Sequence, residues 1–111
     1  MKRFWLRLPD KTDSLEITTS NNKLSLFEYS TEKAYTIEVG KYSLEKLVEN
    51  LVNKGLNAKI GEIKKSPKNS KLIVLLLDNS FTNVSGSFVT FIGGIESIDT
   101  GDRQDGNIIN I

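Results

Sequence analysis

Apolar and polar residues alternate in four short runs over the first 39 residues of the chain. The first run alternates three apolar residues with two arginines and a tryptophan: Arg3, Phe4, Trp5, Leu6, Arg7 and Leu8. Similar alternation occurs at Leu15 and Ile17, over 23–29 and over 34–39. A period of two is typical of a strand with one buried and one solvated face. The four runs predict an antiparallel meander with one wet face.

The apolar spacing lengthens over 44–54. Apolar residues there occupy positions i, i+3, i+4, i+7 and i+8, namely Leu44, Leu47, Val48, Leu51 and Val52. This single stripe predicts an amphipathic helix. Ser43 is suited to the N-cap, and Gly55 to the left-handed position that ends a helix. A helix of about three turns is unstable alone in water, so we expect its stripe to pack on the sheet.

The second half of the chain is richer in apolar runs. A strand is expected around Ile60 and Ile63, followed by a turn over 66–70. Residues 72–77 are six consecutive apolar residues, which predicts a central strand buried on both faces.

We expect a loop over 78–86, because this stretch is polar. Two strands, over 87–92 and 95–98, are expected to form a hairpin at Gly93-Gly94, since tight hairpin turns need positive φ. A last short strand is expected over 108–111.

These elements predict an α+β fold made of a mostly antiparallel sheet of about six or seven strands, with the 44–54 helix on one face. The 111 residues are expected to form a single domain. No apolar run has the length of a signal peptide core or of a membrane-spanning helix, so we expect a cytoplasmic protein.

The chain has no histidine and no cysteine. Histidine is the commonest proton-transfer group near neutral pH, and cysteine supplies the thiolate nucleophile and the soft metal ligand. We therefore expect a protein that is not an enzyme, with no catalytic residue, no metal site and no cofactor.

Charge is unevenly distributed although the net charge is only +1. Residues 54–71 carry six lysines and one glutamate, whereas 72–111 carry five acidic residues and one arginine. Such separation can steer and orient a charged partner. We therefore consider two candidate interfaces. The basic candidates are Lys59, Lys64, Lys65, Lys68 and Lys71, and the acidic loop contributes Asp99, Asp102 and Asp105.

Arg3, Trp5 and Arg7 share one face of the first predicted strand. An indole between two guanidinium groups could stack a base and hold phosphates, which makes nucleic-acid contact an alternative. The competing interpretation is that Trp5 packs inside the fold and the arginines cover it through cation–π contacts.

Three acidic features could carry chemistry. Asp99-Thr100-Gly101 is the tripeptide that carries the catalytic carboxylate in aspartic proteases, but only ten residues follow it, too few to enclose a cleft. A turn at the end of a strand is the simpler interpretation. The acidic loop does not have the ligand spacing of a calcium site. Glu62 and Asp78 could form a carboxylate pair if they faced each other across the central strands.

We expect the chain to be a non-catalytic protein-binding module, such as an inhibitor, immunity or antidefence protein of a microbe or its phage, acting through its polarised charge. The partner is then another protein. The alternatives are a nucleic-acid-binding domain that uses Arg3, Trp5, Arg7 and the 54–71 segment, a carboxylate-based hydrolase that uses Asp99 or Asp78, and a subunit of a homo-oligomeric particle.

Overall fold

A computed structural model describes residues 1–7, 14–64, 70–100 and 108–111 of the chain. Two helices are present in these residues: α1 (Leu44–Asn53) and α2 (Ser87–Phe91). Ten strands are β1 (Lys2–Leu6), β2 (Leu15–Ile17), β3 (Lys23–Glu28), β4 (Thr31–Thr36), β5 (Gly40–Tyr42), β6 (Ala58–Ile63), β7 (Ser70–Leu77), β8 (Phe81–Ser85), β9 (Ile95–Asp99) and β10 (Ile108–Asn110).

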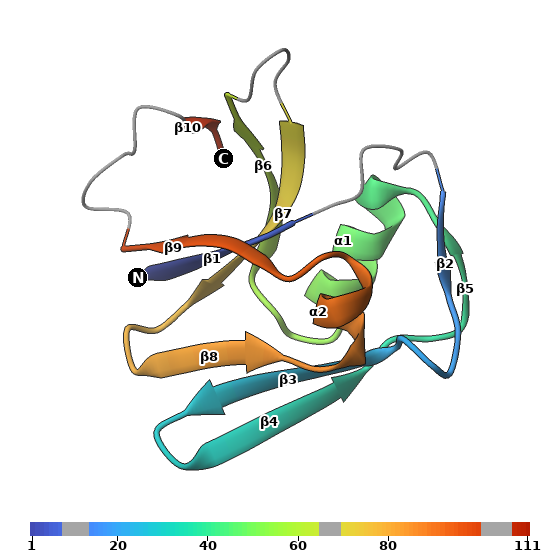
Figure 1. Cartoon of the computed structure of the whole chain (residues 1–111), viewed down its shortest axis with the longest axis horizontal. Coiled ribbons are helices and arrows are strands. Elements are labelled where there is room, and N and C mark those ends of the chain that lie inside the picture. Colours follow the sequence, from blue (N-terminus) through green and yellow to red (C-terminus); the bar gives the residue numbers. More distant parts are fainter. Residues whose placement is uncertain (8–13, 65–69, 101–107) are drawn as a thin grey trace.

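The strands form three antiparallel sheets (Figure 1). The largest sheet has the order β10-β6-β7-β1-β9, the second has the order β4-β3-β8, and β2 pairs with β5. The prediction of an α+β fold with mostly antiparallel strands and one main helix is confirmed. The described residues form ten strands and not the expected six or seven, and these strands include β5 and β8, which were not predicted.

The two faces of the five-stranded sheet bury different residues. One face, with Phe4, Leu6, Ile73 and Leu75, packs in the main core beside α1, α2 and the inner face of the β4-β3-β8 sheet. The other face holds a smaller cluster of Trp5, Ile63, Leu72 and Val74. Since β1 contributes to both clusters, its expected wet face is wrong: Arg3 and Trp5 are both buried.

The predicted helix is confirmed, including both of its ends. The N–H of Lys46 donates to Ser43 Oγ at 3.2 Å, which makes Ser43 the N-cap. At the other end, Leu56 N–H donates to Leu51 O at 3.2 Å and Gly55 has a φ of 93°. This is the Schellman arrangement, in which a glycine takes the left-handed position.

The apolar run is the central strand, as expected. β7 pairs with β6 on one side and β1 on the other, and it is buried on both faces over Leu72–Leu75. A strand covered on two faces has no reason to alternate, which explains its continuous hydrophobicity.

The expected four-stranded meander is wrong. Of its four strands, only β3 and β4 are hydrogen-bonded neighbours. β1 instead pairs with β7 and β9, which lie about 70 to 90 residues later, and β2 pairs with β5. Alternation indicates which face a strand buries but carries no information on its partner, so sequential order was a poor guide.

Two expectations in the C-terminal half are also wrong. The 78–86 loop contains β8, and the run expected to be a strand over 87–92 contains helix α2. Gly93-Gly94 ends this helix and is not a hairpin turn: Gly94 N–H donates to Val89 O at 2.8 Å. Both glycines have positive φ, which suits a helix end as well as a hairpin. The expected turn over 66–70 lies almost wholly outside the described residues.

No helix in the described part of the chain is long and apolar enough to cross a membrane.

Candidate functional site

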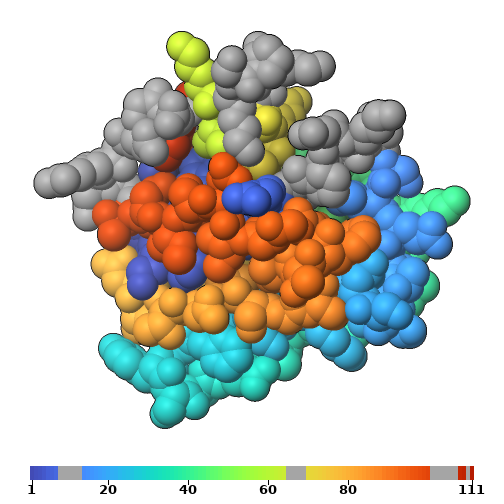
Figure 2. All heavy atoms as spheres, viewed as in Figure 1, coloured from blue at the N-terminus to red at the C-terminus, as the bar shows by residue number. Residues whose placement is uncertain are grey.

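Lysines are exposed along the β6–β7 hairpin. Lys59, Lys64 and Lys71 are all solvent-exposed, while the candidates Lys65 and Lys68 lie outside the described residues. The end of β6 that precedes Lys64 and the start of β7, which contains Lys71, stand out from the body at the top of Figures 1 and 2, whereas Lys59 lies near the other end of β6. We call Lys59, Lys64 and Lys71 the lysine hairpin.

The register of the two strands divides these lysines between the faces of the sheet. Glu62 lies opposite Lys71, and Lys64 is two residues from Glu62, so Lys64 and Lys71 share a face. Lys59 lies opposite Val74 and belongs to the other face. None of the three lysines forms an ion pair with any residue that the structure describes. Their ammonium groups are therefore available to an external acid.

The basic residues of the N-terminal strand are arranged differently. Arg3 Nε donates to Asp99 Oδ1 at 2.5 Å across the β1–β9 pair, and the two side chains are only 8% and 18% exposed. The Arg3 Nη2 atom is buried without a hydrogen-bond partner among the described residues. This pairing unites two of the predicted sites, the arginine face and the acidic loop, in one buried contact.

Trp5 belongs to the same cluster. Its indole N–H donates to Asp99 Oδ2 at 2.8 Å, and its side chain is completely buried. The Arg3 guanidinium carbon lies 5.9 Å from the indole centroid, within cation–π range. The ring lies over β6 at Gly61, where a Cβ would come within 2.6 Å of Trp5 Cη2. Trp5 is therefore packed inside the fold, as the competing interpretation held, and its ring presents no face to solvent.

Glu96 and Arg7 extend the same strand pair. Arg7 Nε donates to Glu96 Oε2 at 2.8 Å, with Arg7 53% exposed. Both acidic side chains of β9 are therefore bound to arginines of the chain. Asp102 and Asp105 lie outside the described residues, so the acidic candidate interface reduces to Asp99 in the structure. Its carboxylate is already engaged by Arg3 and Trp5.

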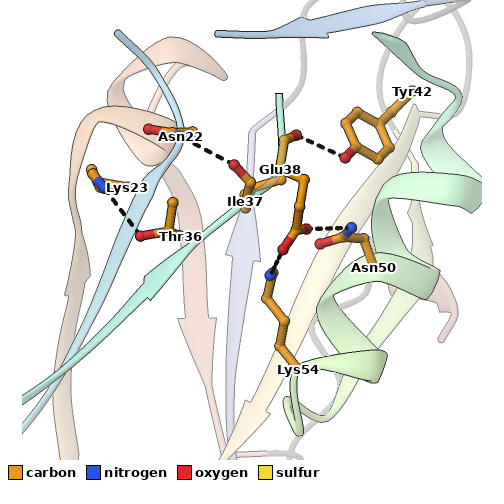
Figure 3. A network of polar contacts seen from close by, with 8 residues as sticks. All are labelled: Asn22, Lys23, Thr36, Ile37, Glu38, Tyr42, Asn50 and Lys54. Atoms are coloured by element: carbon orange, nitrogen blue, oxygen red, sulfur yellow. Dashed lines mark hydrogen bonds and ion pairs between the residues drawn. The ribbon is translucent and has the colours of Figure 1, made fainter. Parts of the chain in front are cut away.

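A third charged cluster joins the segment after β4 to α1 (Figure 3). Glu38 accepts hydrogen bonds from Lys54 Nζ at 2.6 Å and from Asn50 Nδ2 at 2.8 Å. These bonds, the Lys54 bond first, lower the pKa of Glu38 to about 2. Tyr42 O–H donates to the Glu38 carbonyl at 2.7 Å. We call Glu38, Asn50 and Lys54 the helix clasp.

The helix clasp was not predicted from the sequence. Lys54 was counted with the basic segment, yet its charge is balanced by Glu38, sixteen residues earlier. No spacing rule links these residues, because they meet through the fold of a whole connection and not along one helix face. At the same end of β4, Asn22 Nδ2 donates to the Ile37 carbonyl at 3.0 Å.

The suggested carboxylate pair does not form. Glu62 lies opposite Lys71 near the start of β7, whereas Asp78 follows its last residue. Seven residues of extended strand separate the two positions by roughly 23 Å. Among the described residues, no group of three or more histidine, cysteine or acidic side chains is placed to hold a metal ion.

Comparison of the chain with models of known protein families, with curated protein sequences and with solved structures finds no match.

Proposed function

We propose that the protein is a non-catalytic module that binds another protein through the lysine hairpin. One observation carries the proposal: Lys59, Lys64 and Lys71 are exposed and unpaired within the described residues, whereas Arg3, Arg7 and Lys54 are each bound to a carboxylate of the chain. The unpaired charge of the basic segment thereby lies along the β6–β7 hairpin, with Lys64 and Lys71 together on one face.

The partner surface that suits this hairpin is acidic. Exposed charges of one sign raise the rate of encounter with an oppositely charged surface, and they do so most at low salt. The hairpin described here contains lysines without arginine or an aromatic residue on β6 and β7. Lysine gives a mobile point charge suited to carboxylates on a protein surface, whereas base recognition uses stacking and bidentate bonding. A small domain that covers an acidic surface of a larger protein would act as an inhibitor, immunity or antidefence protein.

The nucleic-acid alternative relied on Trp5 as a stacking platform. The completely buried Trp5 ring offers no stacking surface, and Arg3 is buried against Asp99. The proposal therefore places nucleic acid second, as an outcome that the experiment below distinguishes.

The experiment is affinity capture from the native host with three forms of the protein. The test variant carries Lys64→Glu and Lys71→Glu. The control carries Lys41→Glu and Lys46→Glu, which reverse two other exposed lysines, one on β5 and one on α1, the second of which forms a 3.5 Å surface pair with Glu49. We expect a protein captured by the wild type and the control to be lost with the test variant.

Kinetics with that captured protein sharpen the result. At ~0.05 M salt the test variant should associate about tenfold more slowly, and its rate should depend less on salt, because steering charges have been removed. Equal capture by both variants contradicts the proposal. So does capture of nucleic acid alone at ~0.15 M salt, where weak nonspecific binding fades.

A further inference from the structure

The outer edge of β4 faces away from β3. β4 hydrogen-bonds to β3 on one side, and within the described part of the chain no strand pairs with its other side (Figure 1). Its pairing with β3 runs over six residue pairs without a bulge, and it contains no proline. A regular edge of this kind presents a row of N–H and C=O groups to another strand.

The register identifies which residues carry those groups. Ile37 N–H donates to Asn22 O at 2.8 Å, in continuation of the β3–β4 pairing. Hydrogen-bonded and non-hydrogen-bonded residue pairs alternate along two antiparallel strands. Lys33 and Tyr35 therefore direct their backbone groups toward β3, as Ile37 does. The groups directed to the free edge belong to Glu32, Ala34 and Thr36.

We propose that two copies of the chain pair antiparallel through β4, about a two-fold axis at Ala34. Overlap and charge select this register: an axis at Thr31 or Thr36, at either end of β4, would leave most of the strand unpaired. An axis at Glu32 or at Lys33 would bring each residue against its own copy, and an axis at Tyr35 would place Glu32 opposite the partner's Glu38. With the axis at Ala34, no like charges lie opposite each other along the strand.

The same register brings opposite charges together. Glu32 lies opposite the partner's Thr36, on the outer face of the sheet. Lys23 Nζ is 3.1 Å from Thr36 Oγ1 in the chain itself, so each Thr36 has an ammonium group beside it. Within the chain, Glu32 Oε1 accepts a hydrogen bond from Ser25 Oγ at 2.8 Å. In the proposed dimer the same carboxylate also lies across the strand pair from the partner's Lys23, and the two-fold axis makes this contact twice. On the other face, Lys33 lies opposite the partner's Tyr35.

Exposed apolar side chains flank the strand at both ends. Tyr29 is 79% exposed and Val39 is 60% exposed, the two highest values for large hydrophobic residues in the described part of the chain. They lie five residues before and five residues after Ala34. The two-fold axis brings the Tyr29 end of one copy to the Val39 end of the other. Pairing thus covers apolar surface that the isolated chain leaves in water.

Concentration-dependent mass is the first measurement. Six residues from each copy make a small interface, so we expect a reversible dimer. In analytical ultracentrifugation the mass should rise with concentration from 12.4 kDa toward twice that value. Ala34→Pro should keep the mass at 12.4 kDa, because it removes an N–H that faces the edge and not β3. Ala34→Val, which retains the N–H, is the matched control and should still associate.

Charge reversal tests the register without altering the backbone. Glu32→Lys places two lysines together at each contact, and Lys23→Glu places two glutamates together. Each variant alone should associate at least tenfold more weakly than wild type. A mixture of the two should recover the association, because both contacts of the mixed dimer then join a lysine to a glutamate.

A cysteine probe locates the axis. The chain has no native cysteine, so Ala34→Cys introduces a single thiol at the proposed axis. Residues paired across such an axis are about 5.5 Å apart at Cα, which a disulfide can span. Mild oxidation should cross-link this variant far faster than Thr82→Cys, an exposed position on β8 at the other edge of the same sheet.

Three results would each overturn the proposal: a wild-type chain that stays at 12.4 kDa at millimolar concentration, an association unaffected by Ala34→Pro, or equal cross-linking at positions 34 and 82. None of them bears on the lysine hairpin, which lies on the five-stranded sheet. The dimer and the proposed function therefore fail or hold separately.

Discussion

The β1–β9 pair and the lysine hairpin belong to the same sheet and are both rich in basic residues, but they use their charges in opposite ways. Between β1 and β9, Arg3 is buried against Asp99 and Arg7 is bound to Glu96. On the hairpin, Lys64 and Lys71 are exposed and without an ion pair among the described residues. The first set of charges holds strands together, and the second is left to the solvent or to a partner.

The difference teaches that a run of charge identifies a binding surface only after its internal partners are known. Arginine has a planar, weakly hydrated head that tolerates burial beside a carboxylate, whereas lysine keeps its compact charge hydrated. The strand that contains arginines and tryptophan is accordingly a structural element. The lysine hairpin supplies the available charge.

Asp99→Asn has the largest expected effect. It retains the shape of the side chain but leaves the buried Arg3 guanidinium without an opposite charge. Removing one member of a buried ion pair costs about 3 kcal/mol. The free energy of unfolding, measured with urea, should fall by about this amount.

Glu96→Gln is the control on the same strand pair. Arg7 is 53% exposed, and exposed ion pairs contribute about 0.2–1 kcal/mol, well below the loss expected for Asp99→Asn. Equal losses in the two variants would show that burial does not distinguish the Arg3 and Arg7 pairs.

Gly61→Ala is expected to come next. A Cβ at this position would lie 2.6 Å from Trp5 Cη2 and 2.7 Å from Val74 Cγ2, so the indole must move. Overpacking of this kind costs about 2 kcal/mol. Urea unfolding measures the loss, and a red shift of Trp5 fluorescence reports the displaced ring. Gly40→Ala is the matched control, because its nearest neighbour lies at 3.6 Å; destabilisation by that change too would rule out the packing explanation.

The parts of this fold that could be predicted are local. All signals for α1 lie between Ser43 and Leu56, and the apolar run of β7 reports its own burial. Helix α2 was missed because a short apolar run followed by two glycines suits a hairpin as well as a helix end. Contacts with residues outside this segment decide between the two structures.

The charged sites depend on pairing between strands that are far apart in the sequence. Their roles could therefore not be assigned correctly from the sequence. Arg3 and Asp99 are 96 residues apart, and their contact follows from the β1–β9 register. Exposure of the lysine hairpin was easier to anticipate, since unpaired lysines usually remain in solvent. The site that needed no partner within the chain was therefore the more predictable one.

Glu38→Gln tests the helix clasp, an intermediate case in which an exposed carboxylate has partners. The pKa of Glu38 is lowered from 4.5 to about 2, so its ionised form is favoured by folding. The stabilisation is present above pH 4.5 and disappears as the pH falls toward 2. The wild type should therefore be more stable than the variant at neutral pH, with a difference that vanishes near pH 2. We expect a smaller effect than those above, because the Glu38 side chain is 63% exposed and solvent screens the interaction.

Urea unfolding at a series of pH values measures this difference. Glu49→Gln is a suitable control, since Glu49 is 61% exposed and, within the described residues, its ion pair is with Lys46 at 3.5 Å on the helix surface. It should change stability little at any pH in this range. A constant gap between wild type and Glu38→Gln across the titration would contradict the clasp.

Neutralising the lysine hairpin is expected to have the smallest effect on folding. Lys64→Gln with Lys71→Gln removes two exposed charges that have no ion pair within the described residues, so the free energy of unfolding should change by less than about 0.5 kcal/mol. The same variant should lose binding to the acidic partner. A stability loss as large as that of Asp99→Asn would mean that these lysines, too, serve the fold. The contrast between the two strand pairs would then disappear, because a charge cannot be both required inside the chain and available outside it.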